Sequence, residues 1–256
     1  MNRPNPLSGK NRSAIALLTA ALLVVIAAAA AAVLLRGNDE GNDPGRSDAK
    51  PSARKVDPSI VHASERAGRS VNITIDDGPS PRWTPQVLDV LAQYGVKATF
   101  CMIGPEARAH PDLVKKVVAA GHRLCDHSVH HDTGMAEKTE DYQSHEVLDA
   151  EKMIEDASGG APVDYFRAPG GSFDPYNRHL AADHGMRPLG WNVDSEDFKK
   201  PGAAKIVSTV ERELSPEHPT VLFHDGGGDR DQTVAALKEL LPWMKEQGYG
   251  FGFPKR

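Results

Sequence analysis

Carboxylates and histidines that could bind a metal or move protons lie at widely separated places in the sequence. Asp76 and Asp77 are adjacent, and His127 and His131 are four residues apart. One carboxylate and two imidazoles form the ligand set of a catalytic divalent metal that leaves positions open for water and substrate. A four-residue separation places two imidazoles on one side of a helical turn, so we expect His127 and His131 to converge on one ion while His130 points elsewhere. The alternative is a polar loop whose histidines are simply solvated.

Asp76 and Asp77 are expected to differ in role, because adjacent side chains of an extended backbone point to opposite sides. One of them can bind the metal, while the other accepts a proton from water, whose pKa a bound metal ion lowers towards neutrality. The sequence Asp-Asp-Gly-Pro is also common in turns. This pair alone therefore does not distinguish a site from a turn.

The elements that must position these residues alternate between the period of a strand and that of a helix. Val71, Ile73 and Ile75 alternate with polar residues, which is typical of a strand, and Thr84-Pro85 then begins a helix. The same alternation predicts seven strands at residues 71–77, 97–103, 122–126, 165–167, 186–193, 220–224 and 249–253. Helices are predicted between them at 84–94, 111–120, 144–157, 174–184, 203–214 and 232–247. This order predicts an α/β fold with a parallel sheet, open or closed into a barrel.

The candidate residues fall where such a fold would place its chemistry, at the carboxyl ends of the strands. Asp76 and Asp77 end the first predicted strand. The remaining candidates stand at or just after the ends of the third to sixth predicted strands: His127 and His131, Arg167, Asp194 and Asp197, and His224. We therefore interpret these residues as parts of one site.

Five short stretches resemble the ordered motifs of the polysaccharide deacetylases, carbohydrate esterase family four. They are TIDDG at 74–78, HSVHH at 127–131, RAP at 167–169, DSEDF at 194–198 and LFH at 222–224, and the resemblance covers residues 71–254. It implies a distorted seven-stranded (β/α) barrel that removes acetyl groups from N-acetylated sugars, or O-acetyl groups from xylan. It also implies one divalent metal, often zinc, with cobalt or nickel as alternatives.

The resemblance also implies a role for each residue that matches a motif. Asp76 would be the catalytic base, and Arg167 would hold it. The metal ligands would be Asp77, His127 and His131.

The acid and the substrate contacts follow from the later motifs. His224 would be the general acid, and Asp197 would orient it and stabilise its charge. The tetrahedral oxyanion would be held by the metal and by a backbone N–H, that of Gly170. Phe198 stands where the family usually has Trp, and Gly170 where an aromatic residue is common, so substrate fit is expected to differ. Phe198 and Leu222 are expected to contact the substrate.

The amino-terminal part of the sequence predicts a membrane segment and a linker. Residues 14–35 are apolar and uncharged and follow three basic residues, which predicts a transmembrane anchor with residues 1–13 in the cytoplasm. A signal peptide cleaved near residues 27–32 is the alternative. Residues 36–69 are predicted to be a flexible linker, and residues 70–256 a single catalytic domain outside the cell. If the segment is cleaved, the domain would be secreted.

Composition narrows the choice of partners. The formal net charge of −5 argues against nucleic-acid binding, which needs an excess of Lys and Arg. The two cysteines, Cys101 and Cys125, are expected either to form a disulfide or to remain as two buried thiols.

We expect a monomer that acts on peptidoglycan or chitin oligomers. The alternatives are an acetylxylan deacetylase and a non-catalytic glycan-binding protein of the same fold.

Overall fold

A parallel β-sheet forms the centre of the part of the chain that the computed structural model describes, residues 55–217 and 219–256. Its strands run in the order β5-β4-β3-β2-β1-β7-β6, and β8 pairs with the start of β1. The strands are β1 Ser70–Asp76, β2 Ala98–Met102, β3 Arg123–Asp126, β4 Val163–Phe166, β5 Arg187–Pro188, β6 Val193–Asp194, β7 Thr220–His224 and β8 Gly250–Phe251.

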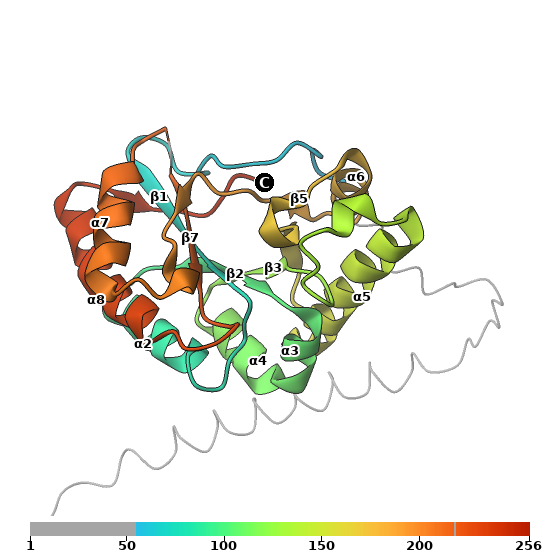
Figure 1. The fold of residues 1–256 in the computed structure, drawn as a ribbon, viewed down its shortest axis with the longest axis horizontal. Coiled ribbons are helices and arrows are strands. Elements are labelled where there is room, and N and C mark those ends of the chain that lie inside the picture. The colour runs from blue at the N-terminus through green and yellow to red at the C-terminus, as the bar shows by residue number, and fades with distance from the viewer. Residues whose placement is uncertain (1–54, 218) are drawn as a thin grey trace, which may run out of the picture. The chain divides into compact units, whose positions relative to one another are not determined.

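Helices follow one another around the outside of the strands (Figure 1). Helix α7 contacts α8, α8 contacts α2, α2 contacts α4, and α5 contacts α3, α4 and α6. Their bounds are α2 Thr84–Gln93, α3 Gly104–Ala109, α4 Pro111–Ala119, α5 Glu140–Ser158, α6 Pro175–Asp183, α7 Ala203–Glu213 and α8 Asp231–Glu246. Three short 3₁₀ helices are η1 Met135–Glu137, η2 Pro169–Gly171 and η3 Asp197–Lys199. The predicted distorted (β/α) barrel is confirmed, although α3 was not predicted.

Strand β1 lies at the middle of the sheet, between β2 and β7, and all of its residues are buried. Val71, Ile73 and Ile75 belong to the main apolar core. The residues that alternate with them are polar and face the interior of the barrel, because successive side chains of a strand point to opposite faces. Thus Asn72 hydrogen-bonds Thr220 there. The polar face of this strand is what brings Asp76 to the carboxyl end of the barrel.

The single strand predicted at residues 186–193 is instead two short strands at opposite edges of the sheet. Strand β5 pairs with β4, whereas β6 pairs with β7. Residues 189–192 cross between these two edges, and we call this crossing the seam. The seam runs close to the side chain of His62 at Gly190, where a Cβ atom would stand 2.3 Å from His62 Nε2. The sequence pattern does not reveal such a break, because both halves remain buried or half-buried.

Residues 55–69 pack on the barrel, so the predicted linker is wrong for this part. Val61 pairs with Leu189 of the seam, donates its N–H to Pro188 O at 2.9 Å and accepts from Gly190 N–H at 3.0 Å. Ser64 pairs with Pro254 farther along. The reason is that Val61 is buried and its segment supplies partners to seam backbone that would otherwise lack them. Residues 36–54 of the predicted linker lie outside the described residues.

The predicted location as a single-pass membrane protein is corrected. Across residues 55–217 and 219–256, no helix has both the length and the apolar character needed to cross a membrane. The longest of these helices, α5, has 19 residues and carries charged side chains along its length. The segment 14–35, to which the anchor was assigned, lies outside the described residues.

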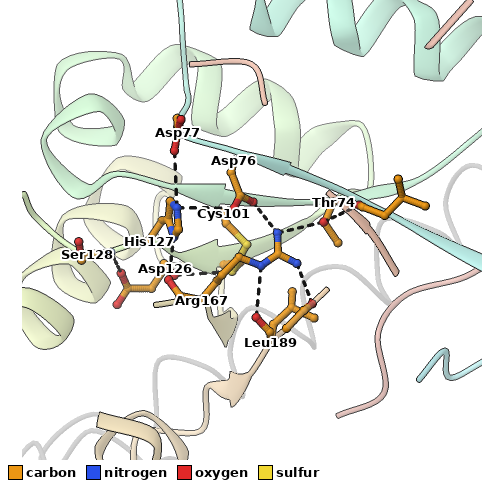
Figure 2. Close-up of a disulfide and its surroundings, with 12 residues drawn as sticks. Thr74, Asp76, Asp77, Cys101, Asp126, His127, Ser128, Arg167 and Leu189 are labelled. Carbon is orange, nitrogen blue, oxygen red and sulfur yellow. Dashed lines mark hydrogen bonds and ion pairs between the residues drawn. A yellow bond between two sulfur atoms is a disulfide. The ribbon is translucent and has the colours of Figure 1, made fainter. Parts of the chain in front are cut away.

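Cys101 and Cys125 form a disulfide between neighbouring strands β2 and β3, so the first of the two alternatives holds. The two residues are direct partners in the parallel register, with their Cα atoms 4.1 Å apart. They lie in a small apolar cluster with Val61, Tyr165 and Leu189. Figure 2 shows that this disulfide lies close to the side chains of Asp76 and Arg167.

We predict that Val61→Asp lowers the free energy of unfolding by at least the ~1.5–3 kcal/mol that burial of a valine side chain contributes. The reason is that Val61 is 6% exposed and packs in an apolar cluster with Leu189 of the seam. Chemical denaturation of the full-length chain measures the change. Ala63→Asp, at an exposed position two residues away, is the matched control and should change stability little. Equal losses in the two variants would contradict a packed role for this segment.

Candidate active site

Asp77, His127 and His131 converge at the carboxyl end of the barrel. Their ligand atoms all lie within 4.8 Å of one another. Asp77 Oδ1 stands 3.5 Å from His127 Nε2 and 3.3 Å from His131 Nε2. This oxygen is buried and receives no well-aligned hydrogen bond, which is costly for a carboxylate unless a cation occupies the space in front of it. The three residues therefore fit a divalent metal, and the predicted ligands are brought together.

The backbone, rather than a helical turn, makes the two histidines converge. Residues 127–131 form an irregular loop after β3. Ser128 and His131 have φ angles of 66° and 53°, and Asp77 has a φ of 74°. A non-glycine residue in this left-handed region is strained and persists only where its surroundings hold it. The expected helical geometry is thus replaced by a strained loop, while the expected convergence is present.

The ring of His127 is held in one orientation and in one protonation state. Its Nδ1 stands 2.7 Å from the carbonyl oxygen of Arg167, so Nδ1 carries the proton and donates. Nε2 is then left as a lone pair that faces Asp77. Burial lowers the pKa of His127, which keeps the ring neutral at neutral pH. A neutral imidazole with its second nitrogen anchored in this way is the usual form of a metal ligand.

The carboxylate of Asp77 is in the charged form that metal binding requires. Burial by itself would raise the pKa of Asp77, but the close ring of His131 and the positive charges of His131 and His224 outweigh burial. The pKa of Asp77 is therefore held below its usual range. The interaction with Asp77 in turn raises the pKa of His131.

Arg167 holds Asp76 from inside the barrel (Figure 2). Its Nη1 donates to Asp76 Oδ1 at 2.6 Å and to Thr74 Oγ1 at 3.0 Å. The other two nitrogens donate to the seam, Nε to Leu189 O at 3.2 Å and Nη2 to Gly190 O at 3.0 Å. Both members of the Asp76–Arg167 pair are buried. Asp76 Oδ2 lies 3.5 Å from His127 Nε2, beside the cluster of Asp77, His127 and His131.

His224, which is half-buried, pairs with the buried Asp197 at the end of β7. His224 Nδ1 stands 2.6 Å from Asp197 Oδ1, and the backbone N–H of His224 donates to Oδ2 at 2.9 Å. Thr233 Oγ1 also donates to Oδ2, which fixes the carboxylate. Burial lowers the pKa of His224, but the hydrogen bond and the charge of Asp197 outweigh it and raise the pKa to about 9. The imidazole is therefore protonated at neutral pH.

The predicted substrate-contacting residues lie around this pair and on η2. Phe198 is 46% exposed, and its ring centroid is 5.6 Å from that of His224. Leu222 is buried on β7 and shares a face of the strand with His224, two residues on. Gly170 is exposed, with φ 60°, and a Cβ atom there would stand 3.1 Å from Thr133 Cγ2. A larger residue at position 170 would need both a strained backbone and a shift of Thr133.

Asp225 is a buried acid of the site that the sequence analysis did not single out. Its Oδ2 accepts a hydrogen bond of 2.5 Å from Thr84 Oγ1, at the start of α2. Its backbone N–H donates to Asp76 O at 3.0 Å. Burial raises the pKa of Asp225 to about 7. In the sequence, Asp225 could have been found from its position directly after His224, at the end of a predicted strand.

Comparison with known proteins identifies the family. The family model described as polysaccharide deacetylase matches residues 63–189. A peptidoglycan-N-acetylglucosamine deacetylase of Bacillus cereus is 39% identical, over 71% of this chain and 84% of that protein. The chain belongs to the polysaccharide deacetylase family. A chitooligosaccharide deacetylase of Sinorhizobium fredii is 37% identical, over 74% of this chain and 92% of that protein. Membership of this family indicates a hydrolase that deacetylates polysaccharides.

A solved structure shows that this fold occurs with and without activity. The polysaccharide deacetylase chain resembles a CE4 family pseudoenzyme from Bacillus anthracis with a TM-score of 0.70 and 28% identity, over 77% of this chain and 68% of that one. A mutant of that pseudoenzyme has restored enzymatic activity and matches with the same TM-score. The residues of the site, rather than the fold, therefore have to support any assignment of activity.

We predict that His127→Ala and His131→Ala each weaken zinc binding by at least ~100-fold, because loss of a direct ligand should cost more than loss of an outer partner, for which 10–100-fold is typical. His130→Ala is the matched control. The His130 side chain is mostly exposed and its Nδ1 faces Glu146 rather than the cluster, so this variant should bind zinc nearly as the parent chain does. Competition with a chromophoric chelator measures the three affinities. Equal losses at all three positions would overturn the ligand assignment.

Proposed function

We propose that this polysaccharide deacetylase is a metal-dependent hydrolase that removes acetyl groups from N-acetylated sugars of peptidoglycan or of chitin oligomers. The observation that carries the proposal is the arrangement of two charged pairs, Asp76–Arg167 and Asp197–His224, around the Asp77, His127 and His131 cluster. The Bacillus relative is a peptidoglycan-N-acetylglucosamine deacetylase and the Sinorhizobium relative a chitooligosaccharide deacetylase, which supports this substrate class. Amide hydrolysis needs a base, an acid and a site for the oxyanion, and the cluster lies beside candidates for each.

The metal would be held by Asp77, His127 and His131. When bound, a divalent ion such as zinc, cobalt or nickel supplies Lewis acidity, which lowers the pKa of water and polarises the acyl oxygen. One carboxylate with two imidazoles suits such ions better than an all-oxygen site would.

Asp76 is proposed as the base that takes the proton from the attacking water. Its carboxylate lies next to the cluster, and Arg167 fixes the position of one oxygen and leaves the other facing His127. A base must be within hydrogen-bonding reach of the proton that it accepts, and a fixed carboxylate at this place meets that requirement.

His224 is proposed as the acid that protonates the leaving amine. Its ring has to be charged when the carbon–nitrogen bond breaks, and Asp197 keeps it charged. The Gly170 N–H is proposed as a second donor to the oxyanion. Phe198 and Leu222 are proposed as the apolar wall around the acetyl methyl group, and the exposure of Phe198 beside His224 supports this role.

Two other functions are the alternatives. An acetylxylan deacetylase would use the same groups on an ester. A non-catalytic glycan-binding protein has a precedent in the pseudoenzyme of the same fold. The deciding experiment measures acetate released by the full-length chain, with added zinc, cobalt or nickel, from peptidoglycan, chitooligosaccharides and acetylxylan. Release from the first two supports the proposal, release from xylan alone favours the esterase, and binding without release favours the pseudoenzyme.

We predict that Asp76→Asn keeps its metal but loses activity by about 10²–10⁴-fold, because an amide cannot accept the proton of the attacking water. Zinc content after dialysis and acetate release measure the two effects separately. Asp77→Asn is the control and should lose the metal as well. Recovery of Asp76→Asn by excess zinc would show that Asp76 is a ligand rather than the base.

We predict that Asp197→Asn moves the alkaline limb of the pH–rate profile to lower pH. The charged form of His224 is the active one, and loss of the Asp197 charge lowers the pKa at which this form is lost. The acidic limb should stay in place. Asp194→Asn is the control, because Asp194 accepts from Glu196 N–H. An unmoved alkaline limb in Asp197→Asn, or a larger shift in Asp194→Asn, would remove Asp197 from this role.

A further inference from the structure

Glu146 is a buried acid that the proposed reaction does not use. It lies on α5, with its side chain 2% exposed. Its Oε2 accepts the backbone N–H groups of Val129 at 3.2 Å and His130 at 2.9 Å. Its Oε1 stands 2.5 Å from His130 Nδ1. All three contacts are made to the loop of residues 127–131, which carries two of the proposed metal ligands.

The backbone of this loop is held at each of four consecutive N–H groups. Ser128 N–H donates to Asp126 Oδ1 at 2.7 Å, and His131 N–H donates to Ser128 Oγ at 3.0 Å. The two N–H groups between them are those accepted by Glu146. The first and last of these N–H groups thus donate to acceptors within the loop or next to it. The two middle N–H groups depend on one side chain, that of Glu146, from a separate helix.

The middle of the loop lies between its two strained residues. Ser128 and His131 both have positive φ, so a free chain would relax away from this shape. Relaxation would turn the His131 ring, whose Nε2 stands 3.3 Å from Asp77 Oδ1. Bonds that oppose this relaxation keep the ligand set together before a metal arrives.

We propose that Glu146 is a positioning residue that holds the 127–131 loop in the strained shape in which His131 and His127 face Asp77, and so raises affinity for a divalent metal. The proposal rests on the assignment of these three residues as metal ligands in the proposed function. Glu146 acts through the loop backbone. It is proposed neither as a metal ligand nor as a substrate contact.

The test compares zinc affinities of full-length variants by chelator competition, together with their thermal stabilities. Glu146→Ala is expected to weaken zinc binding by about 10–100-fold, the usual effect of removing a partner of a metal ligand. Glu146→Asp cannot reach both N–H groups and should also weaken binding. Glu146→Gln keeps an oxygen that can accept both, so it should retain most of the affinity.

Gln143 supplies the matched control on the same helix. It is equally buried, and it holds Lys138 O and Asp174 rather than the metal loop. Gln143→Ala should therefore lower the melting temperature without changing zinc affinity. If Glu146→Ala does not fold, Glu146→Asp against Glu146→Gln decides the matter.

Three results would overturn the inference. They are unchanged zinc affinity in Glu146→Ala and Glu146→Asp, an equal loss in Gln143→Ala, or a loss in Glu146→Gln as large as in Glu146→Ala. The proposed function is tested separately, by acetate release. A parent chain that binds zinc and depends on Glu146, yet releases no acetate, would refute that function alone. A parent chain that binds none of zinc, cobalt and nickel would refute both.

Discussion

The ion pair between Arg167 and Asp76 is the constraint on which the rest of the site depends. A guanidinium buried in the barrel is unfavourable unless it is paired and its donors are satisfied. Here its nitrogens reach Asp76, Thr74 and two seam carbonyls, while the backbone oxygen of Arg167 fixes the ring of His127. One residue thus joins the proposed base, a proposed metal ligand and the closure of the barrel.

Much of the site could be predicted because its residues stand at the ends of strands, and the strands are recognised from their alternation of apolar and polar residues. The alternation of Val71, Ile73 and Ile75 locates β1, and the position of β1 then brings Asp76 and Asp77 to the carboxyl edge. The same reasoning places His224 at the end of β7. Pairings such as Asp197 with His224 needed the family resemblance, since a strand pattern gives the edge and not the partner.

The features that the sequence did not reveal depend on contacts between distant segments. Val61 is buried only because the seam lies beside it, and its own neighbours read as a polar linker. The left-handed backbone of Ser128 and His131 has no signature, because glycine is absent from that loop. Asp225 looks like part of a glycine-rich rim until Thr84 is placed against it. Each of these required the folded chain.

Motions of the seam are expected to affect Asp76, the proposed base. Residues 189–192 join edges that are not paired by a continuous ladder, so this line is where the described sheet has the fewest backbone bonds to break. Opening it would take Leu189 O and Gly190 O away from Arg167 and leave a buried cation partly unpaired. Opening of the seam would therefore leave Arg167, and with it Asp76, less firmly held. Amide hydrogen exchange at Gly190 would report on the order of Asp76, the proposed base, although the two residues lie on different segments.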